Sequence, residues 1–172
     1  MTAPAGRRRP LWVVAALSLL TLGAYVPIWF GLTWAELRRE TKNDAMNPLA
    51  HALMTLVPGL NVTLVWRHFK AINAFLERTG VPMRVDPLSG AIGIIIWWLT
   101  FTHYASDPVF LALDAIELAA GTAVVVYGQR ALNAAWASRG AEERVLETDL
   151  MALAIAGTYA LFTIVGFLAA PS

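Results

Sequence analysis

Five long apolar stretches dominate the pattern of residues along the chain. They cover residues 11–33, 48–66, 88–104, 109–127 and 150–169, and each is 17 to 23 residues long. A helix that crosses about 30 Å of hydrocarbon needs roughly 20 apolar residues, whereas a strand has only about 4–8. Backbone groups in lipid must also be bonded within their own segment. The pattern therefore predicts an all-α fold, a polytopic transmembrane bundle of about five membrane helices in a single integral membrane domain (1–172).

Composition and motifs narrow the function classes. Of the 172 residues, 58% are hydrophobic and 15% are charged, against about 45–50% and about 25% in soluble domains. The net charge of +1 gives no indication of a nucleic-acid partner. Because the chain has no Cys, a disulfide or a thiolate site is excluded. The sequence contains no phosphate loop, nucleophile elbow or dinucleotide fingerprint. We therefore expect no catalytic residue, no metal and no cofactor, and so not an enzyme.

Basic residues predict the orientation of the chain. Arg7, Arg8 and Arg9 precede the first apolar run, and residues 22–24 lack the small-residue pattern of a signal cleavage site. We therefore expect an uncleaved first span after a basic cytoplasmic N-terminus (1–10). With five full spans, this orientation places ten of the 13 Lys and Arg residues inside, as the positive-inside rule requires. The expected location is the bacterial inner membrane, crossed in multiple passes.

Two interruptions leave a second arrangement open. Gly23 lies within the first apolar run, and Pro58-Gly59 lies within the second. Pro costs about 3 kcal/mol and Gly about 1 kcal/mol in the interior of a helix. If both runs fold as re-entrant hairpins, all 13 basic residues can lie inside. However, a re-entrant turn must be buried in protein or line water, and Gly and Pro also occur within ordinary spans.

The chain resembles itself at an offset of 60 residues. Asn47-Pro48 corresponds to Asp107-Pro108, the run KAINA (70–74) to RALNA (130–134), and Gly80 to Gly140. An Asx-Pro pair suits the start of a helix, and Gly suits the position after its end. The repeat therefore predicts two helical hairpins plus one terminal span, with a basic, partly amphipathic tail after the second and fourth spans.

Two short runs resemble a known family. Residues 21–25 read TLGAY and are followed by Trp29, and residues 129–133 read QRALN and are followed by Trp136. These runs are similar to the small bacterial integral membrane proteins catalogued as "domain of unknown function 4234", whose hallmark is a Thr-Leu-Gly-Ile-Tyr run before an aromatic-Trp pair. Here Ala24 replaces Ile, and Ile28 stands where Tyr is commoner. The resemblance implies several short membrane helices and no particular activity.

Asp114 and Glu117 are the two charged residues inside the five apolar stretches. Their i, i+3 spacing places both carboxylates on one face of a helix. An acid near the centre of a bilayer costs about 2.5–3.5 kcal/mol, and such residues often mark ion or proton paths. We therefore predict a candidate intramembrane ion or proton site here. The alternatives are an interfacial segment over 107–117 and a protonated, hydrogen-bonded contact between helices.

Other polar residues give weaker candidates. Arg67, Lys70 and Arg130 lie in the basic tails, where each could contribute about 1 kcal/mol by contacting anionic lipid headgroups. Ordinary topology-setting charge explains them equally well.

Histidines give a further, weak candidate. His51, His103 and Asp107 would meet near the outer face as a polar cluster with donors for a metal or a proton relay. No metal-binding spacing supports that cluster, so separate interfacial partners are the favoured alternative. We predict that His68 is a surface residue.

The expected function is that of a non-enzymatic membrane scaffold, interaction protein or lipid-interacting protein. Its expected partners are the lipid bilayer, anionic lipid headgroups, and a membrane-protein partner or a second copy of the chain. The alternative is a small transporter or channel-like protein that binds a proton or cation at Asp114 and Glu117.

Overall fold

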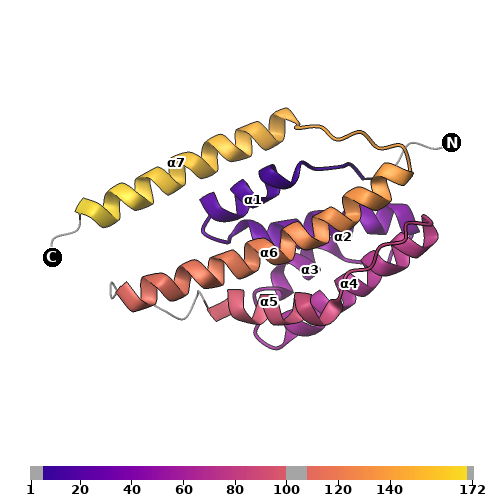
Figure 1. The fold of residues 1–172 in the computed structure, drawn as a ribbon, viewed down its shortest axis with the longest axis horizontal. Helices are drawn as coiled ribbons and strands as arrows, with labels where there is room; N and C mark the ends of the chain where they lie inside the picture. Colours follow the sequence, from indigo (N-terminus) through magenta and orange to yellow (C-terminus); the bar gives the residue numbers. More distant parts are fainter. Residues whose placement is uncertain (1–5, 100–107, 170–172) are drawn as a thin grey trace.

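The computed structural model describes residues 6–99 and 108–169, which form seven helices (Figure 1). The helices are α1 (Leu11–Leu20), α2 (Tyr25–Thr41), α3 (Pro48–Met54), α4 (Leu60–Arg78), α5 (Pro87–Leu99), α6 (Pro108–Ser138) and α7 (Glu147–Ala169). Within the described ranges, the only β-type pairing is an isolated bridge between Arg8 and Glu143. The predicted all-α fold is therefore confirmed for this part of the chain.

The first apolar run (11–33) is not one helix. α1 ends at Leu20, and the backbone then turns through left-handed conformations at Leu22 (φ 50°) and Gly23 (φ 87°) before α2 begins. A helix cannot continue through positive φ. The first apolar run therefore forms two helices, and the break lies at Gly23, where the sequence leaves open a re-entrant turn or a kink within a full span.

The second apolar run (48–66) is broken in the same way. α3 ends at Met54, and α4 begins after Gly59, whose φ is 79°. The corresponding residues sixty positions later are Leu118 and Ala119, and there α6 continues without a break. Leu and Ala are strong helix formers, whereas Pro and Gly are the weakest. The first copy is therefore broken at Pro58-Gly59, and the second copy continues as a helix through Leu118-Ala119.

The sixty-residue repeat is also visible in the bounds of the helices. α3 and α4 together cover 48–78 and α6 covers 108–138, while α5 and α7 begin at residues 87 and 147. Gly80 and Gly140 follow the two long segments with φ of 69° and 78°. Asn47 caps α3 by accepting a hydrogen bond from the amide of Ala50 at 3.0 Å, as predicted, whereas Asp107 lies outside the described residues.

The helices run back and forth between two ends of the bundle (Figure 1). At one end, called here the charged end, lie the N-terminal arm (7–10) and the loops 42–47, 79–86 and 139–146. The other end, the apolar end, holds the turns 21–24 and 55–59 and the last residues of α5. Gly23 packs against Trp97 there, and the indole N–H of Trp98 donates to the carbonyl of Leu56 at 3.2 Å.

Charge is divided unequally between these ends. Twelve of the 13 Lys and Arg residues lie in the N-terminal arm, in the loops of the charged end or in the halves of helices that lead to it, and the thirteenth, Arg67, lies just before the midpoint of α4. Among the described residues, Asp114 and Glu117 are the only acids in the half of the bundle near the apolar end. The separation of charge predicted from the sequence is therefore a separation in space.

The core is built from large aromatic side chains that pack against small residues. Trp29 and Trp97 are completely buried. A Cβ at Gly128 would come 2.5 Å from Cη2 of Trp29, and one at Gly121 would overlap the ring of Trp97. α6 therefore admits both indoles only because it has glycine at these two positions.

α1 lies between α6 and α7. It packs against both helices, whereas among the described residues no Cα of α7 comes within 8 Å of a Cα of α6. In the first copy of the repeat, by contrast, α5 packs directly on α4. α1 and the N-terminal arm therefore occupy the place on α6 that the sixty-residue repeat would give to α7.

Length and hydropathy single out one membrane-span candidate among the described residues. It covers Val109–Ser138 in α6, with a mean hydropathy of 2.0 in its most apolar window. α1 has 10 residues and α3 has seven, so at 1.5 Å per residue neither crosses about 30 Å of hydrocarbon.

Candidate functional site

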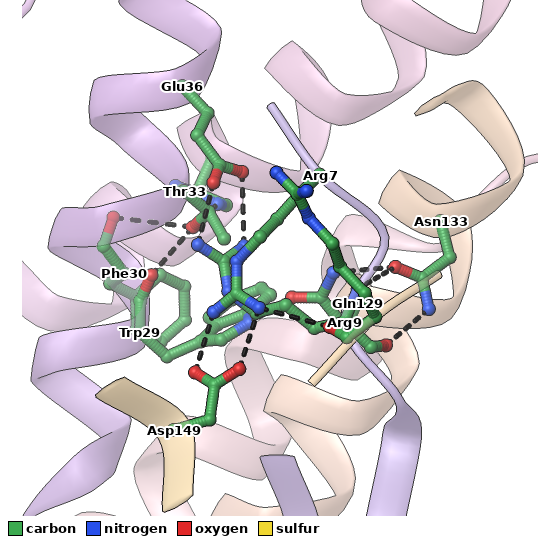
Figure 2. Close-up of polar contacts among 11 residues, drawn as sticks. Arg7, Arg9, Trp29, Phe30, Thr33, Glu36, Gln129, Asn133 and Asp149 are labelled. Atoms are coloured by element: carbon green, nitrogen blue, oxygen red, sulfur yellow. Dashed lines mark hydrogen bonds and ion pairs between the residues drawn. The ribbon is translucent and has the colours of Figure 1, made fainter. Parts of the chain in front are cut away.

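A network of polar side chains joins the N-terminal arm to three helices at the charged end (Figure 2). Arg9, which is 5% exposed, forms a two-pronged ion pair with Glu36 of α2, with N–O distances of 2.6 and 3.1 Å. Burial disfavours the charge on Arg9, but Glu36 outweighs that effect and raises the pKa of the guanidinium. This buried pair fixes the start of α1 against α2.

Asn133 of α6 holds the backbone of the same arginine (Figure 2). Its side-chain Oδ1 accepts from the amide of Arg9 at 3.0 Å, and its Nδ2 donates to the carbonyl of Arg9 at 2.7 Å. Gln129 donates to the same Oδ1 at 2.8 Å and accepts from the indole N–H of Trp29 at 2.8 Å. The backbone amide and carbonyl of Arg9 therefore both attach the arm to α6.

Arg7 forms the third connection, to the start of α7 (Figure 2). Both of its terminal nitrogens donate to the carboxylate of Asp149, each at 2.6 Å. Burial opposes ionisation of Asp149, but the hydrogen bonds from Arg7 and from the amide of Leu146 prevail and lower its pKa. Because α7 packs against α1 alone among the described helices, this pair is a principal anchor of its first turn.

A cavity of about 700 Å³ lies beside this anchor, between α1, α2 and α7. Most of its wall is apolar, from residues such as Leu17, Ile28 and Ala156. Arg7 and Asp149 belong to the same wall. The cavity thus has a long apolar surface and a charged region at the charged end, which is the combination that an amphiphilic ligand requires.

Two histidines form a second buried cluster, between α2, α3 and α4. His51 Nε2 lies 3.1 Å from His68 Nδ1, and His68 Nε2 lies 3.1 Å from Thr33 Oγ1. The single proton of Thr33 goes to the carbonyl of Trp29 at 2.7 Å, so Thr33 accepts from His68 Nε2–H. His68 Nδ1 then carries no proton in the neutral ring and accepts from His51 Nε2–H.

Aromatic rings enclose this histidine pair. The ring of His51 stacks on Trp34, with a centroid distance of 4.1 Å and an interplanar angle of 3°. His68 is completely buried and meets the edge of Phe30 at 5.0 Å. Burial first, and repulsion by His51 second, hold the pKa of His68 well below its ordinary value of 6.5. The pair is therefore suited to the neutral state at physiological pH.

The structure contradicts one sequence prediction at this cluster and leaves another open. The prediction that His68 is a surface residue is wrong, because the apolar face of α4 carries it into the core beside Phe69 and Ile72. His51 is 5% exposed and contacts His68. The other members of the predicted polar cluster, His103 and Asp107, lie outside the described residues. No group of three or more metal-ligating side chains occurs in the part of the chain that the structure describes.

The remaining predicted site residues lie on α4 and α6. Glu117 is 4% exposed, and Asp114, one turn earlier, is half-buried. Arg67, Lys70 and Arg130 are exposed, and Lys70 Nζ lies 5.6 Å from the ring centroid of Trp66. Their exposure leaves all three cations accessible to a headgroup or to solvent.

Sequence reasoning missed the arm network and the histidine pair. For His68 a signal existed, because Val65, His68, Phe69, Ile72 and Leu76 recur at the spacing of one helix face. No local signal distinguished Arg9 from its neighbours, since its partners Glu36 and Asn133 are 27 and 124 residues away.

Comparison with known proteins finds no family model, no curated protein and no solved structure that matches this chain. The resemblance of residues 21–25 and 129–133 to the family of unknown function therefore stays a prediction. The function must be argued from the geometry of the chain itself.

Proposed function

We propose that this chain is a small, multi-pass integral membrane protein that acts as a non-enzymatic, lipid-contacting scaffold, with its charged end in the cytoplasm. The observation that carries the proposal is the pairing of a one-sided charge distribution with an exposed apolar surface. Large apolar side chains are exposed on every helix; examples are Trp12 (59%), Leu53 (57%), Ile92 (49%), Ile116 (60%) and Phe162 (71%).

Such a surface is unsuited to water. A soluble monomer rarely exposes an apolar patch larger than about 300–600 Å². In a bilayer the same side chains would face lipid, and the re-entrant arrangement would place all 13 basic residues on the cytoplasmic side, as the positive-inside rule favours. This distribution favours the re-entrant arrangement over five full spans, because the latter leaves Arg38, Arg39 and Lys42 outside.

The broken helices fit a bilayer as re-entrant hairpins. The part of α2 before Glu36 has 11 residues, or about 16 Å of helix, which is about half of a hydrocarbon core. The turn at its start satisfies its own backbone, since Gly23 N donates to Ser18 O at 2.8 Å and Ala24 N to Thr21 O at 3.0 Å. Gly23 of this turn is buried against Trp97, whereas the neighbouring Leu22 is 45% exposed.

Cysteine labelling tests the topology, because the chain has no native Cys. Single cysteines at positions 42, 78 and 138 are exposed to an impermeant maleimide from outside intact cells. The proposal predicts protection at all three positions and labelling after permeabilisation. Labelling at position 42 alone would support five full spans, and extraction of the chain from membranes by alkali would exclude an integral membrane protein.

A second candidate function is proton or cation transport, which the burial of Glu117 favours. This carboxylate and Asp114 lie on α6, the helix that is long and apolar enough to span a membrane. The double substitution Asp114→Asn, Glu117→Gln should then abolish proton or cation flux in proteoliposomes. If flux is absent, or is unchanged by the substitutions, transport at these carboxylates is excluded and the scaffold function is retained.

A further inference from the structure

We infer that the exposed face of α4 binds the headgroup of an anionic phospholipid of the cytoplasmic leaflet, through Arg67 and Lys70 beside Trp66. The inference rests on the proposed function, because the ligand comes from the bilayer that surrounds the chain. It names the class of lipid that the scaffold contacts and the helix face that contacts it.

The two cations of this face have no internal partner. Arg67 and Lys70 are exposed, and neither forms an ion pair within the described ranges. α4 has no acidic residue before Glu77, whose carboxylate is already paired with Arg84 at 2.6 Å. A guanidinium and an ammonium without a carboxylate partner keep their donors available for phosphate oxygens. This distinguishes the face of α4 from the N-terminal arm, where Arg9 is bound to an acid.

A surface hollow lies beside these cations, on the side toward the apolar end. Its volume is about 500 Å³, and it is lined by Val62, Thr63, Trp66 and Arg67. Lys70 Nζ lies 5.6 Å from the centre of the Trp66 ring, so one indole borders both cations. A phosphate bound by the cations would leave the glycerol and the first acyl carbons of the lipid over Val62 and Trp66.

The position of the cations along α4 favours a phospholipid as the source of the anion. Lys70 lies ten residues after Leu60, which is about 15 Å of helix, or half of a hydrocarbon core of about 30 Å. If the turn 55–59 lies near the centre of the bilayer, as the re-entrant arrangement requires, Lys70 is level with the lipid phosphates. Leu60 is 48% exposed, and Trp66 lies between it and Lys70, where an indole suits the interface. A water-soluble anion would gain nothing from the apolar part of this strip.

The second copy of the repeat provides a matched surface. At an offset of 60, Trp66-Arg67 corresponds to Val126-Tyr127, and Lys70 corresponds to Arg130. The hydroxyl of Tyr127 accepts from the amide of Asp86 at 2.9 Å, so this side chain is engaged within the protein. α6 therefore has one cation where α4 has two, and it should select anionic lipid less strongly.

Fluorescence quenching by brominated lipids tests the inference, because the chain has no native Cys. Thr63→Cys in the hollow, or Ala123→Cys at the matched position of α6, carries a bimane, and both positions are exposed. The vesicles contain equal parts of phosphatidylglycerol and phosphatidylcholine, with bromine on the acyl chains of one lipid at a time. We expect the preference for phosphatidylglycerol to be about fivefold stronger at position 63 than at position 123, because α4 has one more cation.

Charge-neutralising variants assign the preference to the two cations. Arg67→Gln and Lys70→Gln should each reduce it about fivefold at position 63 and leave position 123 unchanged. Arg84→Gln is the control, since it also removes an exposed positive charge, but one that is paired with Glu77, and it should change neither value. An equal preference at both positions of the otherwise unsubstituted chain would overturn the inference. An undiminished preference in the double variant Arg67→Gln, Lys70→Gln would also overturn it.

Two further measurements identify other occupants of this face. Sodium phosphate and sodium chloride at equal ionic strength should weaken the preference equally, by screening. A larger effect of phosphate would reveal a site for free phosphate and would overturn the phospholipid as the ligand. Weak quenching by both brominated lipids at position 63 would show that protein, such as a second copy of the chain, covers α4, and this too would overturn the inference.

Failure of this inference is distinguishable from failure of the proposed function. If the chain resists alkaline extraction and shows the predicted labelling pattern, but position 63 shows no preference for phosphatidylglycerol, only the lipid site is refuted. If the chain is extracted by alkali, the membrane function is refuted, and with it the bilayer as the source of the ligand.

Discussion

His51 donates from Nε2 to Nδ1 of His68 across 3.1 Å, and this contact joins the short helix α3 to the core. α3 has seven residues, too few to be stable alone. Thr33 accepts from the other nitrogen of His68, so one buried imidazole links α2, α3 and α4. The link requires His68 to be neutral, because a doubly protonated His68 has no acceptor for His51.

Stability should therefore fall as the pH is lowered from 7 toward 5. The lowered pKa of His68 means that the unfolded chain, with an ordinary value of about 6.5, takes up a proton that the folded chain excludes. The free energy of unfolding is then greatest above about pH 7 and declines by about 2 kcal/mol by pH 5. Denaturation in mild detergent, followed by circular dichroism at several pH values, measures this slope.

The control for this slope is His68→Gln, which removes the titrating ring. Its stability should be lower at pH 7, and its curve between pH 7 and 5 should be flatter than that of the unmodified chain. An unchanged slope in His68→Gln would show that His68 does not cause the acid sensitivity.

Breaking the buried ion pair should be far more costly than breaking an exposed one. Glu36→Gln leaves the guanidinium of Arg9 charged and buried, which typically costs about 3–5 kcal/mol. Glu77→Gln removes the partner of Arg84, but both of those side chains are more than half exposed, so water screens the loss and at most about 1 kcal/mol is expected. Thermal unfolding of both variants in the same detergent compares them. Equal losses would show that water screens the Arg9–Glu36 pair as it screens the exposed pair.

The two helix breaks should differ in their tolerance of a side chain. Gly23 and Gly59 both have positive φ, which costs a non-glycine residue about 1–2 kcal/mol. A Cβ at Gly23 would also come 2.5 Å from Nε1 of Trp97, whereas a Cβ at Gly59 would have no atom within 4 Å. Gly23→Ala should therefore reduce the unfolding temperature clearly more than Gly59→Ala. The reverse order would show that the turn 21–24 does not pack on α5.

Much of the fold follows from features that act locally. Gly23 and Pro58-Gly59 weaken a helix wherever they stand, so the sequence alone identified both breaks as an alternative to full spans. The charge distribution is also readable, because lysine and arginine avoid lipid regardless of their partners. Local features do not decide whether each broken run crosses the membrane or turns back within it. That choice depends on contacts between distant residues, such as Gly23 with Trp97.

The candidate site was much less predictable. Arg7 and Arg9 had been interpreted as charges that set the topology, but each is paired with a carboxylate that is distant in sequence. The cavity beside them arises because α1 separates α7 from α6. Neither the ion pairs nor the position of α1 can be recognised from a short stretch of sequence, because both depend on residues that are far apart in the chain. The repeat nevertheless carried relevant information, because it placed Asn73 and Asn133 at equivalent positions.

These two asparagines provide the sharpest test of the repeat. Asn73 donates to the carbonyl of Val85 at 2.8 Å and accepts from its amide at 2.9 Å, so it holds the segment that leads into α5. Asn133 makes the same pair of bonds, but with Arg9, ahead of α1. Val145, the counterpart of Val85 at an offset of 60, is not its partner. In the second copy of the repeat, the asparagine therefore holds the N-terminal arm and not the segment that follows its own helix.

Asn133→Ala should consequently weaken the chain more than Asn73→Ala. Asn133 is 8% exposed, and its loss leaves the amide and carbonyl of Arg9 and the side-chain amide of Gln129 without this partner. Each buried polar group without a partner costs about 1–3 kcal/mol. Asn73 is half-buried, so water can replace part of what its side chain provided. In Asn133→Ala, hydrogen exchange should increase at residues 9–14 and at the start of α7, and in Asn73→Ala it should increase at residues 85–90 only. Increased exchange confined to α6 in Asn133→Ala would show that the Arg9–Glu36 pair holds the arm without the two hydrogen bonds between Asn133 and the backbone of Arg9.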